Sequence, residues 1–306
     1  MQNYGRHQMT ASDADSNASE VTSLSVRVTL LTIFIFGALA LLLIPVSNFP
    51  GPQMPGFIPL FVAGIFFAQL PTAFFLILWF RRQCRWSLLL LGCTYFYSAL
   101  MSLSHLLTFP GAILVDQPLV AVPEQSTAWI FAAWTNGFAS LALIAVSLED
   151  RFRDYRCAPN RARRAIAMAL CAVLAAVVIV TLAVAKLELP TLVTQDGFTA
   201  LSWGVRWLSI ILLCSGICLI LFVMREPSDM YLWLSWALTA MVFYTVLSTV
   251  GAARFSVGWY IGRLSWLGSA WVFFVFFVLQ FTRAIPSSVP PPIIPGKAPS
   301  LKGTDG

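Results

Sequence analysis

The stretch LGCTYFYSALMSLSHLLTFPGAILVDQPLVAVPEQSTAWIFAAWTNGF, residues 91–138, decides the fold. It ends one apolar segment, passes through a turn without lysine or arginine, and starts a second apolar segment that contains Trp129 and Trp134. His105, near the end of the first segment, is the one histidine within the apolar segments of the sequence. Similar apolar runs, each long enough to cross a hydrocarbon core about 30 Å thick, recur on both sides. We therefore expect residues 91–138 to lie at the edge of a membrane.

The composition predicts an integral membrane protein. Apolar residues make up 58% of the 306 residues and charged residues 10%, and the mean hydropathy is +0.80. Helices and closed barrels are the structures that satisfy their own backbone hydrogen bonds in lipid. Barrel strands alternate apolar and polar residues, whereas residues 38–44 (ALALLLI) are continuously apolar. The predicted fold class is therefore all-α, a polytopic helical bundle.

Eight transmembrane helices account for the apolar segments. Residues 27–283 are predicted to form one membrane domain, between a polar disordered tail (1–26) and a proline-rich disordered tail (284–306). The expected spans are Val28–Val46, Phe57–Phe80, Trp86–Leu107, Thr127–Leu148, Ala165–Ala185, Ala200–Met224, Met230–Val250 and Leu264–Phe281.

The basic residues set an orientation. If the N-terminus is cytoplasmic, fifteen of the nineteen lysines and arginines fall on the inner side and three on the outer side, and Arg206 lies within a span. Positive charge concentrates on the cytoplasmic side of membrane proteins, so both termini are predicted to be cytoplasmic. The net charge of +6 is then explained by topology and by contact with anionic lipid, and no nucleic-acid partner is predicted.

Several residue types are scarce within the spans. All thirteen aspartates and glutamates are predicted outside the spans or at their ends, and no lysine falls in the middle of a span. Proton pumps, retinal proteins and membrane haem proteins need such residues or paired histidines. The sequence predicts no nucleophile and base pair and no metal-ligand set, so no catalytic residue, metal site or cofactor, and no enzyme, is expected.

One helix face carries a polar stripe. Tyr95, Ser98, Ser102 and His105 are spaced by three, four and three residues, which places them on one face of a helix. The serines could hydrogen-bond to neighbouring helices and hold the bundle together. An ionisable residue within a span, such as His105, more often has a function.

Cations and tryptophans gather at the depth of His105. Arg206 is expected near the outer end of its span, and Arg263 flanks the outer turn between the seventh and eighth spans, at about the level of Trp134. An aromatic belt with arginines that reach toward the interface explains the tryptophans. The alternative is a pocket lined by a histidine, arginines and aromatic rings, which suits an anionic or aromatic small molecule.

Several short motifs match a known family. They are Met54–Pro59, Pro71–Ala73, Leu88–Gly92, Tyr95–Leu100 and the HLLTFPG element His105–Gly111. Together they resemble the fourth class of the MASE-type, membrane-associated sensor domains. The resemblance implies an eight-helix sensor region, which in that family precedes a cytoplasmic output domain such as a diguanylate cyclase or a histidine kinase.

The sequence departs from this family in two ways. Where the family tends to carry Trp-His-x-Gly-Phe, the chain has Trp134-Thr135-Asn136-Gly137-Phe138, so a second histidine is missing. Residues 284–306 contain no cyclase, kinase or receiver pattern. Cyclase activity is therefore not expected from the resemblance.

These observations favour a sensory module of the bacterial inner membrane. It is expected to sit in the lipid bilayer, to bind an unknown small-molecule signal near the periplasmic side, and to act through a cytoplasmic or membrane output protein. A transporter or lipid-handling protein is the alternative. The candidate ligand-binding residues are Tyr95, Ser98, Ser102, His105, Trp134, Asn136, Arg206 and Arg263.

Overall fold

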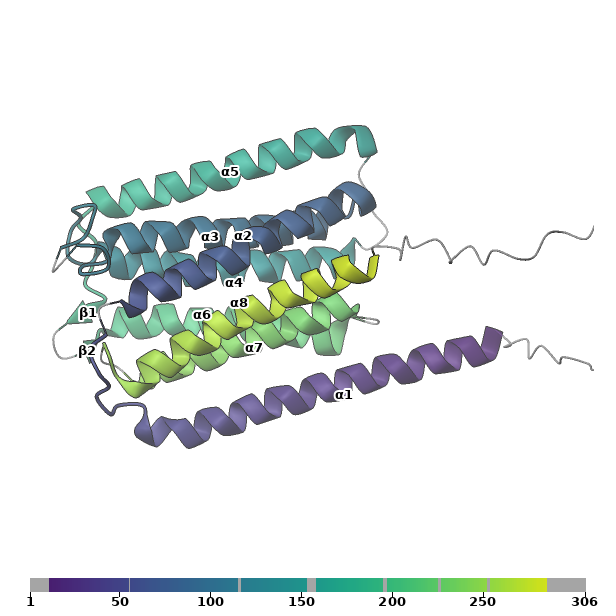
Figure 1. Cartoon of the computed structure of the whole chain (residues 1–306), viewed down its shortest axis with the longest axis horizontal. Helices are drawn as coiled ribbons and strands as arrows, with labels where there is room; N and C mark the ends of the chain where they lie inside the picture. Colours follow the sequence, from purple (N-terminus) through teal and green to yellow (C-terminus); the bar gives the residue numbers. More distant parts are fainter. Residues whose placement is uncertain are drawn as a thin grey trace, which may run out of the picture.

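The computed structural model describes residues 11–54, 56–114, 117–152, 158–194, 197–224, 227–251 and 254–284 (Figure 1). Within these ranges, eight helices are long and apolar enough to cross a membrane, which confirms the predicted all-α membrane bundle. The elements are α1 (Ala11–Leu43), the 3-10 turn η1 (Ile44–Val46), α2 (Phe57–Gln83), α3 (Trp86–Thr108), α4 (Ser126–Arg151), α5 (Pro159–Lys186), the strands β1 (Val193–Thr194) and β2 (Gly197–Phe198), α6 (Ala200–Cys218), the π-helical turn η2 (Leu219–Val223), α7 (Asp229–Val250) and α8 (Val257–Ala284).

The two ends of the bundle differ. One end, here called the hairpin end, carries the antiparallel hairpin β1–β2 and the connections that precede α2, α4, α6 and α8 (Figure 1). The other end, here called the arginine end, carries Arg81 and Arg82 of α2, Arg151 of α4 and Arg161 of α5. α1 begins and α8 ends at the arginine end (Figure 1), as expected for an even number of spans.

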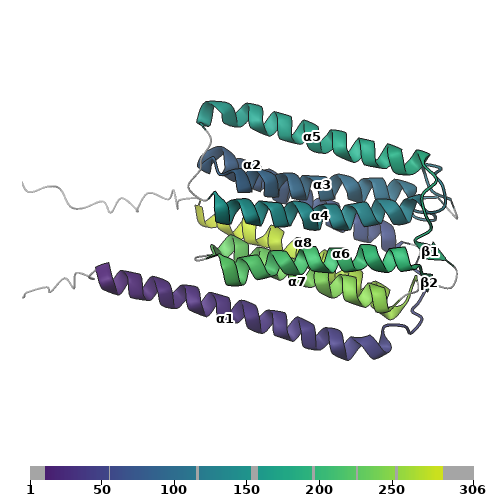
Figure 2. The same ribbon diagram turned by 180° about the vertical axis from the view of Figure 1, so that it is seen from behind.

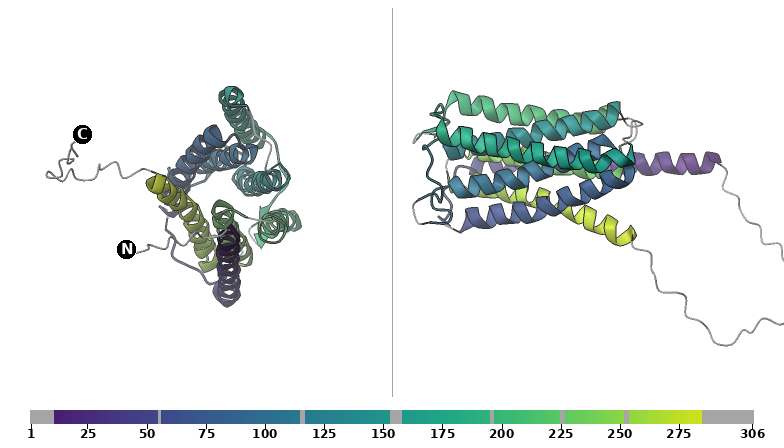
Figure 3. Two further views of the ribbon diagram at one scale, coloured as in Figure 1. Left: turned by 90° about the vertical axis from the view of Figure 1, so that its right-hand side faces the viewer. Right: turned by 90° about the horizontal axis from the view of Figure 1, so that it is seen from above.

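Six of the described helices form a closed ring. Each contacts the next in the order α2, α3, α4, α6, α7, α8, and α8 returns to α2 (Figure 3). α1 packs outside the ring against α7, and α5 packs outside it mainly against α3. The chain therefore leaves the ring for α5, and α6 returns beside α4 (Figure 2).

Aromatic side chains fill the centre of the ring. Trp266 of α8 is fully buried, and its ring centroid lies 4.5 Å from that of Trp134 in α4 and 5.0 Å from that of Tyr244 in α7. Phe61 of α2 is 5.8 Å away. Such tilted and edge-to-face contacts are the favoured geometries of aromatic pairs. Side chains from four helices thus meet at Trp266, and they fix how the ring closes.

The start of α1 differs from the prediction. Residues 11–26 belong to this helix, whereas the sequence predicted a disordered tail over 1–26. The apolar span supplies the costly first turn of the helix, and each further residue then adds one backbone hydrogen bond. The rest of the predicted tails, residues 1–10 and 285–306, lies outside the described residues.

The start of α8 also differs from the prediction. The helix begins at Val257, whereas the predicted span began at Leu264. Gly258 lies in this added turn, where a Cβ atom would stand 2.7 Å from the carbonyl oxygen of Leu247 in α7. The absence of a side chain lets the two backbones approach closely, as in other small-residue helix contacts. Packing against α7 therefore extends the helix beyond the apolar run.

Gly137 of α4 sets the approach of α4 to α3. A Cβ atom at this position would lie 2.5 Å from the hydroxyl oxygen of Tyr97, which donates a hydrogen bond to the carbonyl of Ala133 (2.8 Å). Overpacking costs about 1–3 kcal/mol, and the alanine gains about 1 kcal/mol of helix propensity. We therefore expect Gly137→Ala to lower the unfolding free energy by about 1 kcal/mol, measured by thermal unfolding in detergent.

Gly268 of α8 provides the matched control. A Cβ atom added there would meet nothing within 4 Å, so Gly268→Ala should leave the melting temperature unchanged or raise it. A melting temperature for Gly137→Ala at or above that of Gly268→Ala would contradict the close contact of α3 and α4.

Candidate functional site

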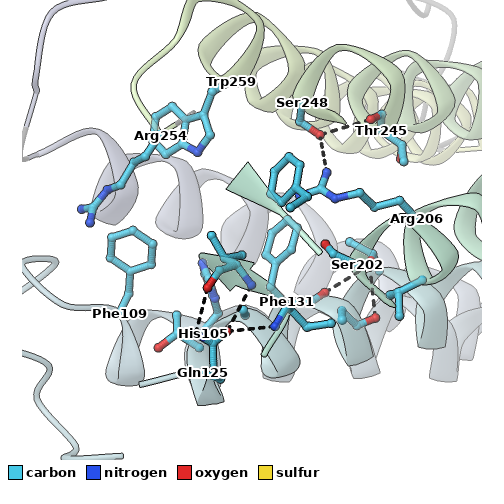
Figure 4. Close-up of a pocket in the computed structure, with 18 of the residues that line it drawn as sticks. His105, Phe109, Gln125, Phe131, Ser202, Arg206, Thr245, Ser248, Arg254 and Trp259 are labelled. Carbon is cyan, nitrogen blue, oxygen red and sulfur yellow. Dashed lines mark hydrogen bonds between the residues drawn. The ribbon is translucent and has the colours of Figure 1, made fainter. Parts of the chain in front are cut away.

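A cavity of about 430 Å³ lies at the hairpin end. Its walls come from the end of α3, the start of α4, α6, the end of α7 and the start of α8, and the hairpin β1–β2 contributes to its cover (Figure 4). This volume falls within the range of about 300–1,000 Å³ that is usual for small-molecule sites. The cavity brings together three of the predicted site residues, His105, Arg206 and Arg263.

His105 lies in the last turn of α3 among aromatic rings. It is 2% exposed, and its ring centroid is 5.1 Å from that of Phe131 and 5.3 Å from that of Phe109. Neither ring nitrogen makes a hydrogen bond of good geometry within the described residues, although the backbone of Thr127 lies close. A buried polar group without a partner is costly. His105 therefore has hydrogen-bonding capacity to offer to an occupant of the cavity.

Arg206 extends from α6 into the cavity (Figure 4). Its guanidinium stacks on Phe198 of β2, 3.8 Å from the ring centre. One terminal nitrogen donates hydrogen bonds to the hydroxyls of Thr249 (3.1 Å) and Ser248 (3.5 Å) in α7. These contacts tie α6, α7 and the hairpin together, and the other guanidinium nitrogens make no hydrogen bond within the described residues.

Arg263 is the most deeply buried cation of the cavity. It lies two turns into α8, is 7% exposed, and stacks 3.9 Å above Trp259. One terminal nitrogen donates to the carbonyl of Trp259 (3.3 Å), whereas the Nε atom has no partner within the described residues. A buried guanidinium that lacks a carboxylate is expensive unless another group supplies charge or hydrogen bonds.

Arg254 was not among the predicted site residues, and it stands at the rim of the cavity. Its guanidinium lies 4.4 Å from the centre of the Phe109 ring (Figure 4) and 4.6 Å from that of Phe255. Partial loss of hydration lowers the pKa of Arg254, and nearby Tyr260 opposes this change. Together with Arg206 and Arg263 it gives the cavity three cations.

The carboxylates do not balance this charge. Glu124 is the acidic residue among those that line the cavity; it is exposed. Within the described part of the chain, the ion pair that forms is Arg85 with Glu149, at the arginine end. No cluster of three or more histidines, cysteines, aspartates or glutamates that could hold a metal occurs among the described residues.

Gln125 connects the start of α4 to the hairpin. Its side-chain oxygen accepts hydrogen bonds from the backbone amides of Leu192 (3.1 Å) and Val193 (3.2 Å), and its side-chain nitrogen donates to the carbonyl of Val193 (3.0 Å). Trp129 adds a bond from its indole to the carbonyl of Pro190 (2.8 Å). These bonds hold the cover over the cavity, and no charge or spacing in the sequence pointed to them.

Three predicted site residues lie in the core of the ring. The indole of Trp134 donates to the hydroxyl of Ser98 (2.6 Å), which joins α4 to α3. Tyr95 stacks on Phe273 of α8 at 5.1 Å and meets Phe138 edge-on at 5.5 Å. All three are buried and outside the cavity lining. The structure thus gives them packing roles, and their contact with a ligand stays a prediction.

Ser102 and Asn136 also stand outside the cavity lining. The hydroxyl of Ser102 donates to the carbonyl of Ala99 in its own helix (2.7 Å). The amide of Asn136 donates to the carbonyl of Ala132 (3.0 Å), and its side-chain oxygen has no partner within the described residues. Their assignment to a ligand likewise stays a prediction.

The model of one protein family, described as "Membrane-associated sensor, integral membrane domain", matches residues 52–283. The chain belongs to the MASE4 family. No curated protein and no solved structure matches it. The MASE4 match takes in every helix of the ring together with α5, and it leaves α1 outside. All helices that form the cavity therefore belong to the MASE4 domain.

The missing second histidine of the MASE4 resemblance maps to the cavity. Thr135 occupies that position, is 8% exposed and lines the cavity that also contains His105. Its hydroxyl donates to the carbonyls of Phe131 (3.1 Å) and Ala132 (3.2 Å) of its own helix. The position at which the resemblance implies a histidine therefore belongs to the cavity wall.

Proposed function

We propose that the protein is a sensory module that binds a small-molecule signal in the cavity at the hairpin end. One observation carries the proposal: His105 and Arg263 line the cavity, and each has at least one buried side-chain nitrogen that makes no hydrogen bond of good geometry within the described residues. An occupant with complementary groups would supply those hydrogen bonds. A difference in its affinity for two packings of the helices would shift the protein toward the packing that it binds more tightly.

The proposed location is the inner membrane of a bacterium, with the hairpin end toward the periplasm. The described arginines of the arginine end belong on the cytoplasmic side by the distribution of positive charge. The cavity would then be open to signals that arrive from outside the cell, whereas α1 and α8 would meet a partner inside it.

The helices that line the cavity also reach the opposite end. α3, α4 and α7 each contribute to the cavity wall. At the arginine end α4 is tied to α3, where Glu149 pairs with Arg85 and accepts a hydrogen bond from Ser87 (2.5 Å). The hydroxyl of Tyr231 in α7 lies near the same carboxylate but makes no hydrogen bond of good geometry within the described residues. A shift of these helices on ligand binding would change this cluster, which is how we expect the signal to reach an output protein.

A cavity-filling variant tests the proposal. Ala128 of α4 lines the cavity, so Ala128→Phe would place a ring in the space for the ligand. A compound that raises the melting temperature of the purified wild-type protein should fail to do so for Ala128→Phe, His105→Ala and Arg206→Ala. The measurement is a thermal-shift screen against a panel of metabolites in detergent.

Ala175 provides the control because it is exposed on the outside of α5. Ala175→Phe should respond to the same compound as the wild type does. A compound that stabilises all variants equally would remove the cavity as its site. Transport of the bound compound into proteoliposomes would show a transporter, and it would contradict a purely sensory function.

A further inference from the structure

We propose that the ligand of the cavity is a small organic carboxylate with an apolar, aromatic body. This inference rests on the proposed function and specifies the chemistry of the signal. It follows from the positions of the three arginines, from the groups that they already contact, and from the size of the cavity and the residues that line it.

The first argument is uncompensated charge. Arg206, Arg254 and Arg263 line one cavity, and the charge of Arg263 is repelled by each of the other two. Glu124 lies at the cavity surface and forms no ion pair within the described residues. Like charges brought together away from water are unfavourable unless an opposite charge joins them. An anion in the cavity would be attracted to all three arginines and would offset this repulsion.

The second argument is the orientation of the guanidinium groups. Each arginine lies over an aromatic ring: Arg206 over Phe198, Arg263 over Trp259, and Arg254 over Phe109. Stacking uses the flat face of a guanidinium, whereas its N–H donors point outward within the plane. Arg206 and Arg263 each use one terminal nitrogen for the hydrogen bonds described above. Their remaining in-plane N–H donors can bind a carboxylate through two parallel hydrogen bonds.

The third argument is size and wall chemistry. A volume of about 430 Å³ far exceeds that of an inorganic anion, since a water molecule takes about 30 Å³ in the liquid. The lining is mainly apolar but includes several serine and threonine side chains, and the rings of Phe109, Phe131, Phe198 and Trp259 border the cavity. These rings favour a flat apolar body attached to the charged group.

Three isosteric probes separate charge from shape. We expect 2-naphthoate to bind the purified full-length protein at least about 10-fold more tightly than 2-naphthamide, because charged hydrogen bonds are stronger than neutral ones. The cation 2-naphthylmethylammonium should bind more weakly than the amide. Acetate and inorganic phosphate, tested in the same titration calorimetry, show whether charge without the apolar body is sufficient.

Variants locate the anion. Arg263→Gln keeps most of the side-chain volume and removes the charge, and it should weaken naphthoate binding by about 10- to 100-fold while it leaves naphthamide binding nearly unchanged. Arg82→Gln makes the same change of net charge at an exposed position of the arginine end, so it should bind naphthoate as the wild type does. Melting curves of each variant check that it is folded.

Two classes of outcome overturn the inference. In the first, naphthamide or the ammonium probe binds at least as tightly as naphthoate and is blocked by Ala128→Phe; the cavity then remains a binding site, but not for a carboxylate. Alternatively, none of the five probes binds more tightly to the wild type than to Ala128→Phe, which leaves the carboxylate without support. The metabolite screen then decides whether the proposed function fails as well.

Discussion

Replacing Trp266 with alanine is expected to lower the unfolding free energy by about 3 kcal/mol. Trp266 is fully buried at the centre of the ring, in contact with Trp134 and Tyr244. A Trp→Ala change in a soluble core costs about 3–5 kcal/mol through lost transfer energy and a new cavity. In a membrane the unfolded helices remain among lipid tails, so the transfer part is smaller and the loss of packing dominates. The expected cost therefore lies at the low end.

Trp271 gives a matched control on the same helix. It is 40% exposed and meets Phe274 edge-on at a centroid distance of 5.6 Å. Trp271→Ala should cost less than about 1 kcal/mol, as is usual for surface positions. Thermal unfolding and titration with a denaturing detergent measure both variants. Equal destabilisation by the two substitutions would show that the helices do not close around Trp266.

Replacing Glu149 with alanine, at the arginine end, should lower the unfolding free energy by a similar amount. Glu149 pairs with Arg85 and accepts a hydrogen bond from Ser87, so Glu149→Ala leaves a cation and a hydroxyl without their partner. Breaking a buried ion pair costs about 3–5 kcal/mol. The side chain of Arg85 is 24% exposed, and water can reach it, so we expect about 3 kcal/mol, the lower bound of that range.

The neighbouring carboxylate and the double variant complete this test. Asp150 is exposed, so Asp150→Ala should change the unfolding free energy by less than about 0.5 kcal/mol. Arg85→Ala combined with Glu149→Ala should cost less than the sum of the single changes, because the two residues act on each other. Additive costs would mean that the pair does not form.

Hydropathy was sufficient to predict the eight helices, because a membrane imposes a minimum length on every apolar segment. It did not predict that α6 follows α4 in the ring, with α5 outside. Lipid tails and helix side chains are similarly apolar, so length and hydropathy do not identify neighbours. A usable signal was nevertheless present: α1 and α5, the two most apolar spans, are the least buried, whereas α3 and α7, the least apolar, are the most buried.

The site was predicted in part. His105 and Arg206 were recognised because charged or ionisable residues within spans are costly. Arg263 was recognised because it flanks the outer turn at about the same depth, and the structure gathers all three at one cavity. Spacing placed Tyr95 and Ser98 on the same face as His105. It could not show that this face packs inside the ring of helices at Tyr95 and Ser98 and lines the cavity at His105. The exact contacts of the cover, such as those of Gln125, depend on backbone groups that carry no sequence signal.

The buried ion pair was missed for a related reason. Glu149 follows the apolar run of its span and was placed outside the membrane with the other carboxylates. α4 continues through Arg151, so Glu149 remains on the helix and faces Arg85 and Ser87. A pair formed by residues at the ends of two different spans requires knowledge of which helices are neighbours.

The side of the membrane on which the cavity opens is the most direct test of the account. Thr194 of β1 is exposed and lines the cavity, and Asn160 of α5 is exposed at the arginine end. Each is replaced with cysteine in a protein whose six native cysteines are changed to serine, and spheroplasts are treated with a membrane-impermeant maleimide. The account predicts that Thr194→Cys is labelled in intact spheroplasts, whereas Asn160→Cys is labelled only after the spheroplasts are lysed. Labelling of Asn160→Cys before lysis, with Thr194→Cys protected, would contradict it.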